Sequence, residues 1–211
     1  MQGSSLRAHE GTLTSRVLAA EGPWVDLDEM TSRACGLASC RIAHATGDGG
    51  TTLEAVRIRG QQAQIIHLGD SRTYLFRDST LRQLTSDHSL VAEKIADGTL
   101  TPEAARTDPR RNIVTRALGR KLSPPDLNSL DLLDGDELLL CSDGLTGPVD
   151  DEGIGAILSR TRGHLEEAAN ALIDAAYEGG APDNVKVLLV GVPKGRKSAP
   201  PWRKAKVTPR T

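Results

Sequence analysis

The chain contains 211 residues, of which 38% are hydrophobic and 26% are charged, so it is long enough for one globular domain with a substantial core. Aromatic residues make up only 2%, which argues against the stacking surfaces that bind single-stranded nucleic acid. No apolar run is long enough to cross a bilayer and the first residues are polar, so we expect a cytoplasmic protein without a membrane segment. The cysteines have no CxxC spacing, so we expect three reduced core residues rather than disulfides or a zinc site: Cys35, Cys40 and Cys141.

Positive charge is concentrated at the carboxyl end of the chain. The segment 193–211 holds seven Lys and Arg residues and no acid, so the net charge of −2 becomes −9 when these seven are set aside. Basic segments rich in proline usually lack regular structure, and we predict a disordered tail. Whether this tail also binds an anionic partner stays open, and the acidic remainder is compatible with cation binding.

The first half of the chain predicts one helix followed by short strands. Apolar residues recur at helical spacing between positions 31 and 45, and a glycine-rich turn follows at 46–50. Alternating apolar residues then predict strands at 52–59 and 62–68, joined at Gly60, and a hairpin with strands at 73–76 and 81–84. This order is typical of an antiparallel meander.

The second half predicts a small helical insertion and then two strands separated by helices. Residues 88–96 have a weak helical pattern, and Thr101 followed by Pro102 is a favourable start for another helix. Continuous apolar runs predict strands at 136–141 and 185–192. Helical spacing predicts two helices between these strands, around 154–158 and 165–173, with the second ending at Gly179-Gly180. The mixture predicts an α+β layered sandwich rather than a doubly wound parallel sheet.

Three aspartates lie in turns at the ends of predicted strands. Asp70 and Asp143 each follow an apolar strand beside a glycine, and Asp183 precedes the last strand. If the three side chains converge at one edge of the sheets, they supply the carboxylate oxygens that Mg²⁺ and Mn²⁺ prefer. Each one taken singly is most often a turn residue that bonds nearby amides.

The order of these motifs resembles the type 2C (PPM) family of metal-dependent serine/threonine phosphatases, in its bacterial form. The resemblance is carried by Gly69-Asp70-Ser71-Arg72, by the run 139–145 around Asp143, and by the turn 182–185 around Asp183. Further matches are Gly50-Thr51-Thr52-Leu53 and the segments 84–91, 98–105 and 112–118, which are similar to the family's flap region. The resemblance implies the family's α-β-β-α sandwich of antiparallel sheets. The implied segments are a divergent start at 1–30, the phosphatase-like domain at 31–192 and the basic tail at 193–211.

The resemblance also implies a reaction and a set of site residues. In the family, a water activated by two Mg²⁺ or Mn²⁺ ions attacks the phosphorus of phosphoserine or phosphothreonine. On the matching positions, Asp143 and Asp183 would bind metal directly, and Asp70 would share an additional metal with Asp143. No side chain would act catalytically beyond that water. The residues expected to hold the turns and carboxylates in place are Asn184, Arg72, Gly144 and Ser142. The implied partners are a phosphoprotein substrate in signal transduction and a serine/threonine kinase, with no nucleic acid.

Three residues near these motifs carry alternative interpretations. Arg72 could instead form an ordinary ion pair, with Asp70 as the candidate partner. His67 is better explained as a packed or exposed strand residue than as a metal ligand. His88 lies in the flap region, where a solvated loop histidine is the simpler interpretation than a substrate contact.

The sequence before Gly50 departs from the family pattern. It contains neither the family's Glu-Asp strand, nor its Asp-Gly-Met-Gly-Gly loop, nor its phosphate-binding arginine. Because two neighbouring cations need a bridging carboxylate, we expect this chain to bind at most one divalent ion, weakly, and to have little activity. Three readings stay open: an active phosphatase whose missing strands lie upstream, a catalytically impaired pseudophosphatase that acts as a binding module, and, more distantly, an unrelated hydrolase.

Overall fold

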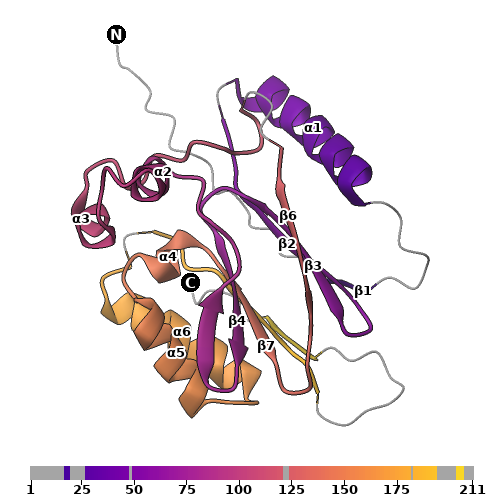
Figure 1. Cartoon of the computed structure of the whole chain (residues 1–211), viewed down its shortest axis with the longest axis vertical. Helices are drawn as coiled ribbons and strands as arrows, with labels where there is room; N and C mark the ends of the chain where they lie inside the picture. Colours follow the sequence, from indigo (N-terminus) through magenta and orange to yellow (C-terminus); the bar gives the residue numbers. More distant parts are fainter. Residues whose placement is uncertain are drawn as a thin grey trace.

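The protein is a sandwich of two β-sheets with helices on both outer faces (Figure 1). The structure is a computed structural model that describes residues 17–19, 27–47, 49–120, 124–181, 183–193 and 203–206. Helix α1 (Leu27–Thr46) covers the four-stranded sheet, and helices α5 (Asp151–Arg160) and α6 (Leu165–Glu178) cover the five-stranded sheet. The predicted α-β-β-α architecture is confirmed.

The four-stranded sheet has the order β1-β2-β3-β6. Its strands are β1 (Val17–Ala19), β2 (Leu53–Arg59), β3 (Gln62–Leu68) and β6 (Asp126–Asp131). Pairing is antiparallel except between β1 and β2, which run parallel. The β2–β3 hairpin confirms the strands predicted at 52–59 and 62–68. The polar segment that forms β6 gives no alternation that would have indicated a strand.

The five-stranded sheet has the order β5-β4-β7-β8-β9 and is antiparallel throughout. Its strands are β4 (Arg72–Arg77), β5 (Thr80–Gln83), β7 (Glu137–Cys141), β8 (Val187–Gly191) and β9 (Arg203–Lys206). Every residue of β7 is buried, as expected for a central strand covered on both faces. Strand β9 pairs with β8 and lies in the tail predicted to be disordered, so that prediction does not hold for these four residues. The rest of 194–211 lies outside the described residues.

Three apolar layers hold the sandwich together. The middle layer lies between the sheets, where Val56 and Ile65 from one sheet meet Leu138 and Leu140 from the other. The second layer packs the short helix α4 (Asp143–Thr146) together with α5 and α6 on β4, β7 and β8, and it includes Tyr74, Phe76 and Leu139. The third, smaller layer packs α1 on its sheet through Cys35 and Leu68. Burial of this aliphatic surface is the main force that fixes the sheets face to face.

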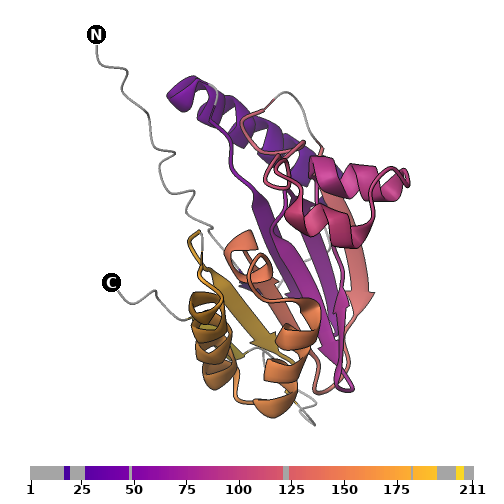
Figure 2. The same ribbon diagram turned by 90° about the vertical axis from the view of Figure 1, so that its left-hand side faces the viewer.

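The predicted helical insertion lies beside one end of the sandwich (Figure 2). It contains α2 (Leu90–Ala96) and α3 (Pro102–Thr107), whose first turns are capped by the side chains of Ser89 and Thr101. The short helix α4 (Asp143–Thr146) begins at Asp143, where the sequence had indicated a turn. No helix among the described residues is long and apolar enough to cross a membrane.

The cysteines agree with the sequence prediction in their redox state and only partly in their position. All three are free thiols, and Cys35 and Cys141 are buried. Cys40 is exposed on α1, so its placement in the core was wrong. Its helical face points away from the sheet, because the apolar face of α1 is formed by Cys35, Ala38 and Ile42.

Candidate active site

The three predicted aspartates line one cavity. Asp70, Asp143 and Asp183 come from three separate segments and reach a cavity of about 1200 Å³. Its walls are formed by the end of the sandwich, the α2–α3 insertion and the connection from α4 to α5. The three aspartates therefore share one cavity, and their role as metal ligands stays a prediction.

The segments that carry Asp143 and Asp183 are held against each other by the Ser142 side chain and by a close backbone approach at Gly144. The hydroxyl of Ser142 donates a hydrogen bond to the carbonyl of Asn184 at 3.0 Å and accepts one from the backbone N–H of Lys186 at 3.0 Å. A Cβ at Gly144 would lie 2.5 Å from the Asn184 carbonyl oxygen, so only glycine fits this close approach. Ser142, Gly144 and Asn184 thus all lie at the junction, and Asn184 contributes through its backbone.

Asp70 lies in a turn that requires glycine at the position before it. Gly69 has φ of +120°, which is unfavourable for other residues, and a Cβ there would lie 2.4 Å from the Thr52 side chain. Thr52 in turn forms a hydroxyl–hydroxyl hydrogen bond of 3.0 Å with Ser71. The Gly-Thr-Thr-Leu motif and the Gly-Asp-Ser-Arg motif therefore pack directly on each other.

Arg72 pairs with Asp87 and not with Asp70. Its Nε and Nη2 donate to the two Asp87 carboxylate oxygens at 2.8 and 2.7 Å, and its Nη1 donates to the hydroxyl of Tyr74 at 3.0 Å. The Tyr74 hydroxyl in turn donates a hydrogen bond to Asp151 Oδ1 at 2.9 Å. The suggested Arg72–Asp70 pair was wrong because the planar guanidinium is already held on two sides in a bidentate arrangement, which is the geometry that favours arginine.

The carboxylates in the cavity repel one another. Burial, followed by the charges of Asp143 and Asp87, raises the pKa of Asp70 to about 6. Loss of solvation against the walls of the cavity, followed by the charge of Asp183, also raises the pKa of Asp143. A bound cation would relieve this repulsion, and oxygen-only donors suit Mg²⁺ or Mn²⁺.

The described donors nevertheless do not form a closed metal cage. No group of three or more His, Cys, Asp or Glu side chains within the described ranges lies close enough together to hold a metal ion. Asp143 and Asp183 are both exposed to solvent, and Asp183 already accepts a hydrogen bond from the backbone N–H of Asn184 at 2.6 Å through one of its two oxygens. The residues therefore fit a divalent cation that keeps much of its water.

The two histidines near the site are both buried, which corrects the expectation for one of them. His67 lies across β2–β3 from Glu54, and its Nδ1 is 2.6 Å from the Glu54 carboxylate, so its interpretation as a packed strand residue is confirmed. Burial raises the pKa of Glu54, and the Glu54 contact outweighs burial and raises the pKa of His67. Both shifts favour a proton kept within the pair. His88 is buried at 6% exposure rather than solvated in a loop, because its ring is enclosed by Gly69, His67 and Asp126.

Two arginines of the insertion also line the cavity, and sequence reasoning missed them. Arg106 and Arg111 reach the same space as the three aspartates, and neither forms an ion pair with another described residue. The arginine-rich run around Arg110-Arg111 in a segment that covers an acidic site was the available signal. Asp87 was missed for a different reason, since only the fold brings it to Arg72.

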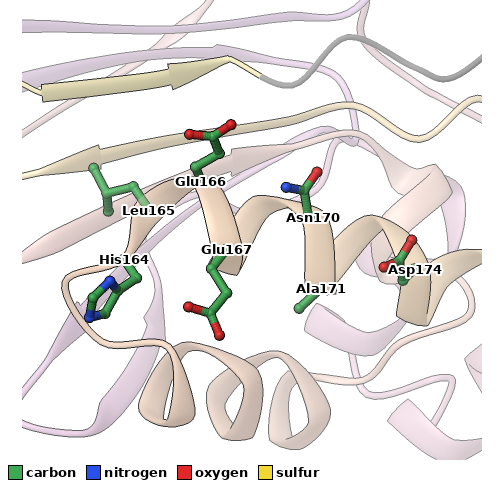
Figure 3. Close-up of a pocket in the computed structure, with 7 residues that line it drawn as sticks. All are labelled: His164, Leu165, Glu166, Glu167, Asn170, Ala171 and Asp174. Atoms are coloured by element: carbon green, nitrogen blue, oxygen red, sulfur yellow. The ribbon is translucent and has the colours of Figure 1, made fainter.

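A second hollow, of about 610 Å³, lies along α6 and carries no comparable chemistry. Figure 3 shows Glu166 and Glu167 pointing to opposite sides of this helix, so their carboxylates do not converge. None of the residues singled out from the sequence lines it.

Comparison with known proteins gives a consistent family. The family model described as Protein phosphatase 2C matches residues 26–185. The serine/threonine protein phosphatase PstP of Mycobacterium tuberculosis is 42% identical over 143 residues, which are 68% of this chain and 27% of that protein. The protein phosphatase PhpP of Streptococcus pneumoniae is 42% identical over 144 residues, which are 68% of this chain and 58% of that protein. The chain therefore spans about a quarter to just under 60% of these relatives.

Solved structures agree with this assignment. The crystal structure of the Mycobacterium tuberculosis phosphatase PstP/Ppp superposes with a TM-score of 0.73 at 38% identity, covering 81% of this chain and 74% of that one. A structure of the PstP catalytic domain in complex with two manganese ions gives a TM-score of 0.69 at 35% identity, covering 81% and 73%. The match runs through the sandwich and all three aspartate motifs, and the chain belongs to the protein phosphatase 2C family of metal-dependent phosphatases.

Proposed function

We propose that this chain is a metal-dependent protein phosphatase that hydrolyses phosphoserine and phosphothreonine in proteins. The observation that carries this proposal is the meeting of Asp70, Asp143 and Asp183 in one cavity. Relatives that are 42% identical are named serine/threonine phosphatases, which supports the choice of substrate. A serine/threonine kinase that makes the phosphoproteins is the expected counterpart in signalling.

We propose that the cation bound by this chain is Mg²⁺ or Mn²⁺. On the family's pattern Asp143 and Asp183 would hold one ion, and Asp70 would share Asp143 with another. With at most one ion bound, Asp143 is common to both positions and the Asp70 carboxylate adds its charge beside it. When bound, a divalent cation would lower the pKa of its bound water and neutralise charge on the phosphoryl oxygens. The PstP structure named above holds two manganese ions. For this chain we propose at most one, bound weakly, since no described group of three donors forms a cage.

The protein's own residues bind and orient the phosphate ester. Arg106 and Arg111 place positive charge at the wall of the cavity formed by the insertion, in the same cavity as the aspartates. Guanidinium groups suit phosphate because their N–H donors can bond two phosphoryl oxygens at once. The substrate phosphate would therefore lie between these arginines and the aspartates. Arg72 is already paired with Asp87, and this pair stabilises the part of the cavity wall where both residues lie.

Hydrolysis of an aryl phosphate and of a phosphothreonine peptide, followed with and without Mn²⁺, tests the proposal. We expect slow hydrolysis that depends on Mn²⁺ and is lost in Asp143→Ala. The matched control is Asp174→Ala, which removes an exposed carboxylate outside this cavity and should leave the rate unchanged. Hydrolysis that persists in Asp143→Ala would place the active site elsewhere.

A further inference from the structure

His88 and Gly69 are joined by two reciprocal hydrogen bonds across 19 positions of the chain. The backbone N–H of His88 donates to the Gly69 carbonyl at 2.7 Å, and the backbone N–H of Gly69 donates to His88 Nδ1 at 3.0 Å. Gly69 immediately precedes Asp70 and adopts the left-handed conformation that makes the turn. The orientation of the Asp70 carboxylate thus depends on a turn that His88 holds through both its backbone N–H and its side chain.

The opposite side of the His88 ring is anchored at the four-stranded sheet. Because Nδ1 accepts from Gly69, the neutral ring carries its proton on Nε2, which donates to Asp126 at 3.0 Å. Arg116 holds the other Asp126 oxygen at 2.9 Å. Arg116 Nη1 also lies 2.7 Å from Nε2, and in this tautomer that is a contact between two donors rather than a hydrogen bond. The Gly69 contact thus sets the tautomer of the ring, and Asp126 accepts the proton on Nε2.

A row of side chains on the four-stranded sheet, buried at Glu54 and His67 and partly exposed at Asp126, lies next to the ring. Glu54, His67 and Asp126 are cross-strand neighbours on β2, β3 and β6, so they lie in one line across the sheet. The His67 ring lies 4.6 Å from the His88 ring between centroids. His67 Nε2 donates to the Ser86 carbonyl at 2.9 Å, two residues before His88. The start of the insertion is therefore tied to the sheet at two adjacent points.

We propose that His88 is a positioning residue that sets the Gly69–Asp70 turn and so determines whether the Asp70 carboxylate can help hold a divalent cation. The role rests on the function proposed above and adds a residue that does not touch the substrate. The carbonyl of His88 also accepts from the N–H of Thr115 at 2.8 Å, which closes the base of the insertion. One residue thus links the turn of Asp70 to the segment that carries Arg106 and Arg111. Residues that orient metal-binding groups typically change metal affinity by about 10–100-fold when they are replaced.

Two substitutions of His88 separate this role from a general packing role. The side-chain carbonyl of asparagine can take the place of Nδ1 and accept from Gly69, whereas the longer glutamine places its amide near Nε2 and loses that acceptor. Calorimetric titration with Mn²⁺ should show affinity reduced at least about tenfold in His88→Gln and within about threefold of wild type in His88→Asn. The control Asp126→Asn keeps the Gly69 contact and should resemble His88→Asn. Equal losses in the two His88 variants would overturn the proposal.

Measurements on the metal-free protein keep the proposal testable if a variant fails to fold or if Mn²⁺ does not bind. Imidazole ¹⁵N spectra of the wild-type protein should show a proton on Nε2 and none on Nδ1, and exchange of the Gly69 amide proton should be slow. A His88 ring with its proton on Nδ1, or rapid exchange of the Gly69 amide proton, would refute the positioning role of His88 whatever the activity. Wild-type protein with a protected Gly69 amide but no Mn²⁺ binding would instead refute the proposed function.

Discussion

Asparagine in place of Asp70 removes a negative charge from a cavity that holds several others, while it keeps the size of the side chain. In the metal-free protein we expect Asp70→Asn to raise the free energy of unfolding at neutral and alkaline pH. The reason is that the Asp70 carboxylate is disfavoured in its charged form, first by burial and then by the charges of Asp143 and Asp87, which together raise its pKa.

The size of the effect follows from that pKa. A rise from the ordinary value of 3.8 to about 6 corresponds to at most about 3 kcal/mol. Because the folded state holds this proton more tightly than the unfolded chain, the favourable contribution is complete below the ordinary pKa of 3.8 and is lost as the pH rises through about 6. The gain from Asp70→Asn should thus approach zero near pH 4 and be complete above about pH 7, where it raises Tm by up to about 10 °C.

Thermal unfolding in EDTA, measured between pH 4.5 and pH 8 for both proteins, checks this reasoning. Asp174→Asn is the matched control, because it removes an exposed carboxylate that does not line the cavity and should show no such pH-dependent gain. Excess Mn²⁺ should stabilise the wild type more than Asp70→Asn, since the cation neutralises the charge that the variant lacks. An Asp70→Asn variant no more stable than wild type at pH 8 in EDTA would refute the electrostatic argument.

Three further substitutions probe the supports of the site and the core. Arg72→Lys loses the bidentate contact with Asp87 and should reduce hydrolysis at saturating Mn²⁺ while leaving a folded protein; an unchanged rate would show that the pair does not matter. Gly144→Ala drives a methyl group against the Asn184 carbonyl and should weaken Mn²⁺ binding in calorimetry, an expectation that unaltered affinity would contradict. Leu139→Ala empties a fully buried position and should cost about 2–5 kcal/mol in urea unfolding, whereas a cost below about 1 kcal/mol would mean that the layer collapses around it.

Local patterns were sufficient for most of the sandwich. The hairpin of β2 and β3 was predictable because apolar residues alternate on both sides of the turn at Gly60, and the structure pairs them in that register. Strand β6 could not be recognised, because its polar sequence forms a strand only through pairing with β3. The same holds for β9, which lies in a basic segment and pairs with β8.

The site shows the same division between local and tertiary information. Each aspartate motif is contiguous in sequence, so Asp70, Asp143 and Asp183 could be recognised one by one and then expected to meet. The partner of Arg72 and the enclosure of His88 depend on residues 15 and 38 positions away, brought together only by the packing of the insertion on the sheets. Sequence patterning carries no signal for such contacts.

Calorimetric titration of the wild-type protein and of Asp143→Ala with Mn²⁺ tests most directly whether the cavity is a metal-dependent active site. The account predicts weak binding of no more than one ion to the wild type and no detectable binding to the variant, with Asp174→Ala unchanged. Equal affinity in wild type and Asp143→Ala would contradict the assignment of the site, and tight binding of two ions would contradict the proposed number.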